Sequence, residues 1–221
     1  LTDYSKEALD KITSTDEEVI AAKATLLDVI AKFRNVDRFY RIFDNAKNTL
    51  AYYLNKSYDP RTPIVGDNPT DFSQTNYGNN DVTGPDSSHG THVAGIIAAV
   101  RGNSKGVDGV AENVKIMVLL AVPDGDERDK DVALAVRYAV NNGAHVINMS
   151  FGKGFSPHKA RVDEAFLYAA EKGVLLFHAA GNSAENNDLG NNFPNRMVLD
   201  AAIKDLPERI ATWIEVGASA Q

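Results

Sequence analysis

The sequence contains no cysteine and no long apolar run. Without cysteine the chain has no disulfides, thiolate nucleophiles or thiolate zinc sites, and its redox compartment stays open. No stretch reaches the roughly 18 uninterrupted apolar residues of a membrane span. The first residues, LTDYSKEALD, contain no apolar core, so we expect no signal peptide among them.

The sequence also lacks an excess of basic residues. It has 23 lysines and arginines against 30 aspartates and glutamates, for a formal charge of −7. No cluster of basic residues resembles a phosphate-binding face, so nucleic acid is not an expected partner. With 221 residues and 43% hydrophobic content, the chain can bury a core of one domain, with or without an appendage.

The first 55 residues contain neither glycine nor proline and are rich in helix-forming residues. Ser14 or Thr15, followed by glutamates at 17 and 18, matches a capping box. Two apolar stripes then recur at helical spacing, at 19, 22, 26, 30 and 33 and at 36, 39, 40, 43, 46, 50, 53 and 54. This pattern predicts an antiparallel helical hairpin over 16–55, with two faces that pack together.

After a polar, turn-rich stretch over 56–88, apolar runs alternate with helical patterns. Strands are expected at 114–122, 145–150 and 174–179, and helices at 132–143 and 156–173. Ser156 is the expected cap of the second helix, before Pro157. This alternation predicts a three-layer α/β domain whose parallel sheet is covered on both faces. Ligands of such sheets bind beyond the carboxyl ends of the strands, here at 150–152 and 179–182.

The segment SSHGTHVAGIIAA (87–99) places two histidines at the start of a helix of small residues. His89 could act as a general base, or the helix could simply pack closely against the sheet. A metal site on His89, His92 and Asp86 is disfavoured, because a catalytic zinc needs three well-supported ligands and no HExxH pattern occurs. The glycines of GKG (152–154) do not complete a nucleotide-binding loop.

Three segments taken together, SSHGTHVAGIIAA, VINMSFG (146–152) and LLFHAAGNSAEN (175–186), resemble the subtilisin-like serine peptidases, the subtilases. The resemblance runs from about Gly78 to Gln221 and includes NSKGVDGVAENVKI (103–116) and WIEVGAS (213–219). It implies a serine endopeptidase that cleaves peptides or proteins through an acyl-enzyme and acts outside the cytoplasm. It also implies that 56–221 is part of a subtilisin-like core and that the 1–55 hairpin is an insertion.

The resemblance assigns a role to each matching position. His89 matches the histidine that takes and returns the proton, and Asn182 matches the side chain that donates to the oxyanion. His92 has no catalytic counterpart and is expected to make internal hydrogen bonds. The residues that match the two walls of the substrate pocket are Ser150, Phe151, Gly152, Ala179, Ala180 and Gly181. A second substrate-pairing edge falls at Asp124 to Asp126, although the acidic DGDERD departs from the small-residue loop of the family.

Two family motifs are missing from these 221 residues. Neither Asp-Ser/Thr-Gly, which supplies the carboxylate, nor Gly-Thr-Ser, which supplies the nucleophile, occurs. Ser219 matches a strand rather than a nucleophile, and Asp86 is expected to cap the helix or shape its turn. We therefore expect an internal fragment of a peptidase domain, incomplete at both ends and inactive alone. The alternative is a pseudoenzyme or a module that binds peptides without cutting them.

Neither a metal nor another cofactor is required by the resemblance. Many family members bind calcium, and Asn103 matches one ligand position in a loop, which leaves calcium open there. His145 and His178 lie on expected buried strands, where a histidine usually has a structural role.

Overall fold

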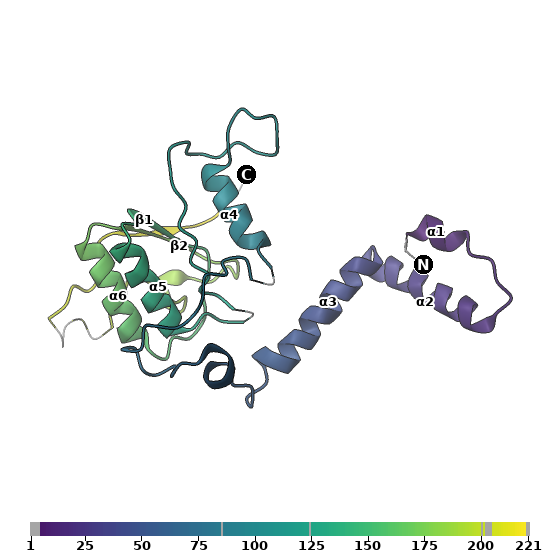
Figure 1. Ribbon diagram of the computed structural model, residues 1–221, viewed down its shortest axis with the longest axis horizontal. Helices are drawn as coiled ribbons and strands as arrows, with labels where there is room; N and C mark the ends of the chain where they lie inside the picture. The colour runs from purple at the N-terminus through teal and green to yellow at the C-terminus, as the bar shows by residue number, and fades with distance from the viewer. Residues whose placement is uncertain (1–4, 85, 124, 200, 202–204, 220–221) are drawn as a thin grey trace. The chain divides into compact units, whose positions relative to one another are not determined.

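The structure, a computed structural model, describes residues 5–84, 86–123, 125–199, 201 and 205–219. The chain forms two compact units, Leu1–Tyr58 and Asp59–Gln221. The first unit is helical, and the second contains a β-sheet (Figure 1). No helix within the described ranges is both long and apolar enough to cross a membrane.

The first unit consists of helices joined by short connections. Its elements are α1 (Lys6–Asp10), α2 (Glu17–Phe33), α3 (Val36–Asn48) and the π-helical turn η1 (Thr49–Tyr53). The predicted cap is displaced by one or two residues, because the side chain of Asp16, rather than Ser14 or Thr15, accepts from the amides of Glu18 and Val19. A carboxylate at this position satisfies two free amides and complements the helix dipole.

The two long helices do not bury their apolar stripes against each other, contrary to the predicted hairpin. No residue of α2 is buried, and Val36 is the only buried residue of α3. Phe33 and Phe39 meet edge to face at the two-residue connection, with ring centroids 5.2 Å apart. Beyond this contact the aromatic side chains stay exposed, Phe43 by 55%. The amphipathic pattern identified the helices but not a partner for their apolar faces.

The second unit is built around a three-stranded parallel sheet. Its elements are η2 (Arg61–Val65), α4 (Ser88–Ala98), α5 (Asp129–Asn141), β1 (Val146–Met149), α6 (Lys159–Glu171), β2 (Leu175–Ala179), η3 (Asn187–Leu189) and β3 (Trp213–Val216). The strand order is β1-β2-β3, with Met149 opposite His178 and Ala179 opposite Val216. The α/β alternation expected from the sequence over 132–179 is confirmed.

Helices α5 and α6 lie side by side on one face of the sheet (Figure 1). Leu176, His178 and Trp213 point into this core from β2 and β3. Phe166 of α6 meets the Trp213 ring edge to face at 5.2 Å. Burial of the apolar members of this core, which include Leu176, Phe166 and Trp213, stabilises the sheet against the helices.

The opposite face of the sheet is not covered, so the predicted second helical layer is absent from the described part of the chain. Val146 and Val216 are 53% and 50% exposed on that face. Helix α4, whose small residues were expected to lie close against the sheet, has no buried residue. Nothing lies within 4 Å of a Cβ built on its Gly95. Small residues permit close approach, but they do not by themselves provide attraction.

The apolar run 114–122 does not form the predicted strand. No described strand pairs with it, and Val118 and Leu120 are 47% and 55% exposed. A buried strand needs backbone partners on a neighbouring strand as well as apolar composition, and composition alone does not supply them.

Both helices on the covered face end near the expected glycines. Gly143 and Gly173 follow α5 and α6 with φ of 83° and 74°. The start of α6 differs from the prediction, because its cap is His158 and not Ser156. The carboxylate of Asp129 accepts from the His158 amide at 2.6 Å, which ties this turn to α5 and moves the first helical residue to Lys159.

A buried ionic network surrounds the first turn of α5. Asp67 accepts hydrogen bonds from Arg61 at 2.5 Å and from Lys130 at 2.7 Å, and its side chain is fully buried. Asp131 accepts from Arg61 at 2.7 and 3.0 Å and from the Tyr77 hydroxyl at 2.5 Å. Burial alone would raise the pKa of Asp67, but the hydrogen bonds from Lys130 and Arg61 outweigh it and lower that pKa.

We expect Asp67→Ala to lower the free energy of unfolding by about 3–5 kcal/mol, because it leaves the Lys130 ammonium buried without its carboxylate. Urea unfolding of the 221-residue chain measures this loss. The control is Glu164→Ala, which removes the exposed partner of Arg161 and should cost less than about 1 kcal/mol. Equal losses in the two variants would contradict the importance of the buried network.

Candidate functional site

Two chain segments leave the same edge of the sheet at the carboxyl ends of β1 and β2. Met149 and His178 are register partners, so Ser150–Gly152, directly after β1, is next to Ala179–Gly181, which begins with the last residue of β2. The amide of Ala180 donates to Val216 at 2.9 Å, which extends the pairing with β3 by one residue. We call these two segments the β1 wall and the β2 wall. The structure brings them together as the sequence predicts.

Asn192 lies between the two walls and was not identified from the sequence. Its side-chain amide donates to the carbonyl of Ala179 in the β2 wall at 3.3 Å. A Cβ built on Gly152 of the β1 wall would lie only 2.5 Å from the Asn192 Oδ1. The next residue, Phe193, pairs in antiparallel fashion with Lys153. No local pattern in the asparagine-rich NNFPN marks this role, because it depends on the return of a distant loop to the sheet edge.

Asn182 directly follows the β2 wall and is exposed. Gly181 before it has a φ of 86°, a left-handed conformation that a glycine adopts without steric cost. The Asn182 side chain makes no hydrogen bond to a described residue, so its amide can donate to a group that enters from solvent.

His89 lies in the first turn of α4 and is also exposed. Asp86 accepts from the amide of Ser88 at 2.8 Å, so it shapes the turn before the helix as the sequence predicts. Hydrogen bonding by the side chain of Ser88, followed by that of its amide, lowers the pKa of Asp86. Within the part of the chain that the structure describes, the His89 ring makes no hydrogen bond, and none joins α4 to either wall. The structure therefore assembles Asn182 with the walls and leaves His89 on a separate helix.

The surroundings of His92 and His145 differ from the predictions. The exposed His92 ring makes no hydrogen bond to any residue in the described ranges, whereas internal hydrogen bonding was predicted. His145 precedes β1 and is exposed rather than buried, because it lies at the end of the sheet and not within the strand.

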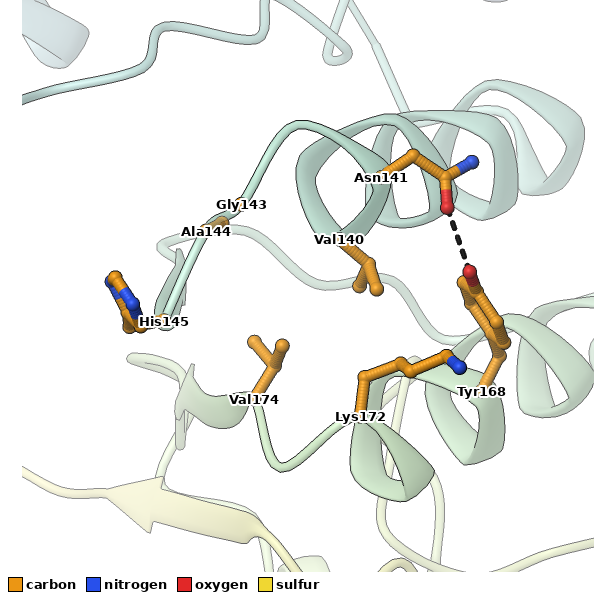
Figure 2. A pocket seen from close by; sticks show the side chains of 8 residues that line it. All are labelled: Val140, Asn141, Gly143, Ala144, His145, Tyr168, Lys172 and Val174. Carbon is orange, nitrogen blue, oxygen red and sulfur yellow. Dashed lines mark hydrogen bonds between the residues drawn. The ribbon is translucent and has the colours of Figure 1, made fainter.

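A surface pocket of about 420 Å³ opens near His145 (Figure 2). The side chains around it come from the ends of α5 and α6 and from the residues before β1 and β2, and the Tyr168 hydroxyl donates to Asn141 at 2.7 Å. This pocket lies at the amino ends of the strands and includes none of the predicted site residues. It is therefore separate from the edge that carries the walls and Asn182.

The predicted substrate-pairing edge is only partly described. Asp124 lies outside the described residues, and Asp126 is exposed. Glu127 is buried, and burial raises the pKa of its carboxyl group. Its carbonyl accepts from the ammonium of Lys153 at 2.6 Å, which links this edge to the residue that follows the β1 wall.

The loop that was predicted to include a calcium ligand gives little support to a metal site. The Asn103 Oδ1 accepts from the amide of Lys105 at 2.9 Å, and the Asp108 Oδ1 accepts from Gly102 at 3.0 Å. Calcium takes six to eight oxygen ligands. Among the residues with described positions, no group of three His, Asp or Glu side chains could hold a metal ion. Calcium at Asn103 stays a prediction, and no chemical step is assigned to it.

Sequence comparison extends the similarity beyond the three motifs. The sequence model of the subtilase family matches residues 41–221, which begins inside α3, well before Gly78. Similar proteins include a thermophilic serine proteinase from Bacillus sp. (strain AK1), 35% identical over 137 residues that cover 59% of this chain and 33% of that protein. Subtilisin BL from Lederbergia lenta is 37% identical over 132 residues, which cover 59% of this chain and 47% of that protein.

A cell wall-associated protease from Bacillus subtilis (strain 168) is 41% identical over 118 residues, which cover 53% of this chain and 13% of that protein. The matched part of the chain thus spans between 13% and 47% of the length of these three relatives.

We expect Gly152→Ala to destabilise the sheet edge by about 1–3 kcal/mol, because the new methyl group would displace the Asn192 amide from Ala179. The matched control is Gly154→Ala, since nothing lies within 4 Å of a Cβ at Gly154. This control should be neutral or stabilising by about 0.4–1 kcal/mol. Urea unfolding compares the two variants, and the Asn192 side-chain amide signals in NMR should shift only in Gly152→Ala. A shift in both variants, or in neither, would refute the contact.

Proposed function

Because the chain belongs to the subtilase family, we propose that it supplies the histidine base, the oxyanion donor and the substrate walls of a serine endopeptidase. The observation that carries this proposal is the convergence of the β1 wall and the β2 wall at one sheet edge, directly before Asn182. The substrates would be peptides or proteins, whose extended backbone could lie along neighbouring strand ends.

In this proposal Asn182 acts on the transition state. Attack on the scissile carbonyl places negative charge on its oxygen, and a preorganised amide donor stabilises that charge. The exposed Asn182 side chain has its donors free for this purpose among the described residues. The size of the effect is known from a subtilisin, where loss of the corresponding donor lowers kcat by about 10²–10³.

His89 would take the proton of the serine nucleophile and then deliver it to the leaving amine. This role requires a carboxylate to hold the imidazole and a serine within hydrogen-bond reach. Neither the Asp-Ser/Thr-Gly nor the Gly-Thr-Ser motif occurs in the 221 residues. We therefore propose that these residues alone do not hydrolyse peptides, and that His89 works only when a carboxylate and a serine lie beside it.

We also propose that residues 1–55 are an insertion relative to a minimal subtilisin-like core and that 56–221 form part of that core. The separation of the helical unit from the sheet-containing unit supports this division. The family match from residue 41 indicates that the boundary is not sharp. An extracytoplasmic location is proposed from kinship, since one relative is a cell wall-associated protease.

A second candidate function is peptide binding without cleavage. The absence of both motifs from these residues favours it. The two functions share the walls and Asn182 and differ only in whether a serine attacks the bound peptide.

Labelling with a fluorophosphonate probe separates the two functions. We expect the product of the complete gene to be labelled at a serine and the 221-residue chain to remain unlabelled, because the probe reacts only with an activated serine. Mass spectrometry of the labelled peptide identifies the site. A complete gene product without label would support peptide binding instead, and label on the 221-residue chain would disprove its inactivity.

Substitutions in the complete gene product test the two assigned roles. His89→Ala should abolish turnover, whereas Asn182→Ala should lower kcat by about 10²–10³ with a much smaller change in KM. The control is His92→Ala, on the same helix and equally exposed, which should retain activity. Steady-state kinetics on a peptide substrate measure all three. Loss of activity in His92→Ala together with normal turnover in His89→Ala would reverse the assignment.

A further inference from the structure

His178 lies in β2, immediately before the β2 wall, and its side chain is almost completely buried. The ring uses both of its nitrogens. Nδ1 lies 3.1 and 3.2 Å from the two carboxylate oxygens of Glu215, and Nε2 lies 2.9 Å from the carbonyl oxygen of Phe151. His178 and Glu215 are register partners on neighbouring strands, whereas Phe151 belongs to the β1 wall. The imidazole therefore connects the wall after β1 to β3 across β2.

The protons on this ring follow from its partners. A carbonyl oxygen can only accept a hydrogen bond, so Nε2 must carry a proton. Nδ1 faces a carboxyl group, and a single proton between them is on the imidazole or on Glu215. If Nδ1 holds it, the ring is a cation that donates twice. If Glu215 holds it, both groups are neutral.

Other contacts of Glu215 favour the charged arrangement. The indole nitrogen of Trp213 donates to one carboxylate oxygen at 2.8 Å, and the Asn187 amide donates to the other at 3.3 Å. Donors on both oxygens stabilise the ionised form of a carboxyl group. The Glu215 side chain is also 32% exposed, so water contributes to its solvation.

Burial of His178 opposes a positive charge, because a charged ring loses its hydration. The Glu215 carboxylate and two charge-assisted hydrogen bonds offset that cost. The Trp213 ring lies 5.2 Å from the imidazole and completes its surroundings. Glu215 is the only titratable group among its contacts with described residues.

We propose that His178 is a positively charged positioning residue that holds the β1 wall in place through its Nε2–H bond to Phe151. A side chain of the neighbouring strand β2 would hold the wall from the covered face of the sheet, so that a substrate would bind to a preformed groove. The charge on His178 is argued from its hydrogen bonds alone, whereas the effect on substrate binding rests on the proposed peptidase function.

NMR of the 221-residue chain with ¹⁵N-labelled histidine tests the charge. Both ring nitrogens of His178 should carry a proton, because both face hydrogen-bond acceptors. The exposed His89, His92 and His145 provide reference signals in the same spectrum. In Glu215→Gln, which keeps the size but removes the negative charge, the His178 ring should carry one proton. A His178 ring with an unprotonated nitrogen in the unsubstituted chain would overturn the proposal.

Kinetics of the complete gene product test the positioning role. His178→Gln should raise KM about tenfold with a smaller change in kcat, because the loosened wall binds substrate less well before and during the reaction. His145→Gln, at an exposed position before β1, is the control and should leave KM unchanged. Equal KM values in the His178→Gln variant and the parent would overturn the positioning role. If the parent does not hydrolyse peptides, the proposed peptidase function is wrong. The NMR experiment tests the charge of His178 independently of that outcome.

Discussion

Three consecutive charged residues at the start of α5 hold the sheet-containing unit together. Lys130 and Asp131 bind Asp67 and Arg61 in the long polar loop that precedes α4. Asp129 pairs with Lys153 at 2.6 Å and also accepts from the first turn of α6. Each interaction joins chain segments far apart in sequence, and the groups involved are largely buried. Buried charged side chains destabilise a folded protein unless they are paired with opposite charges. We infer that the network therefore specifies one arrangement of the loops rather than simply adding stability.

The same network reaches the candidate site. Lys153, held by Asp129, immediately follows the β1 wall, and its backbone pairs with Phe193 beside Asn192. His178 contacts the wall from the covered face of the sheet. The β1 wall thus contacts the His178 ring at Phe151 and continues into Lys153, whose ammonium is paired with Asp129. Several separate contacts would have to break before this wall could move.

Structural features that depend on local sequence patterns could be predicted, whereas features that depend on contacts between distant residues could not. The strands at 146–149 and 175–179 and the helix at 129–141 follow from local hydrophobic patterns, and the family motifs located His89, Asn182 and the walls. The buried charges could not be predicted, because DERDKD (126–131) resembles an exposed charged loop until Arg61, Asp67 and Lys153 are placed beside it. The same limit explains the run at 114–122, whose composition suits a strand but cannot identify a partner. Asn192 was missed because its side-chain contacts, with Ala179 and Gly152, lie 13 residues or more away in sequence.

The candidate catalytic groups are held in two different ways. Asn182 follows a wall that is hydrogen-bonded to β3, whereas His89 lies on α4, which is supported mainly by the turn after it. In that turn the Gly109 amide donates to Ala99 at 3.0 Å, and a Cβ on Gly109 would lie 2.3 Å from the Ala99 nitrogen. Among the described residues, the hydrogen bonds that α4 makes beyond the helix and its ends go to residues 109–111 and not to the sheet. It follows that the sheet fixes the position of Asn182 and the two walls, while the position of His89 depends on the contacts of α4 with the segment that follows it.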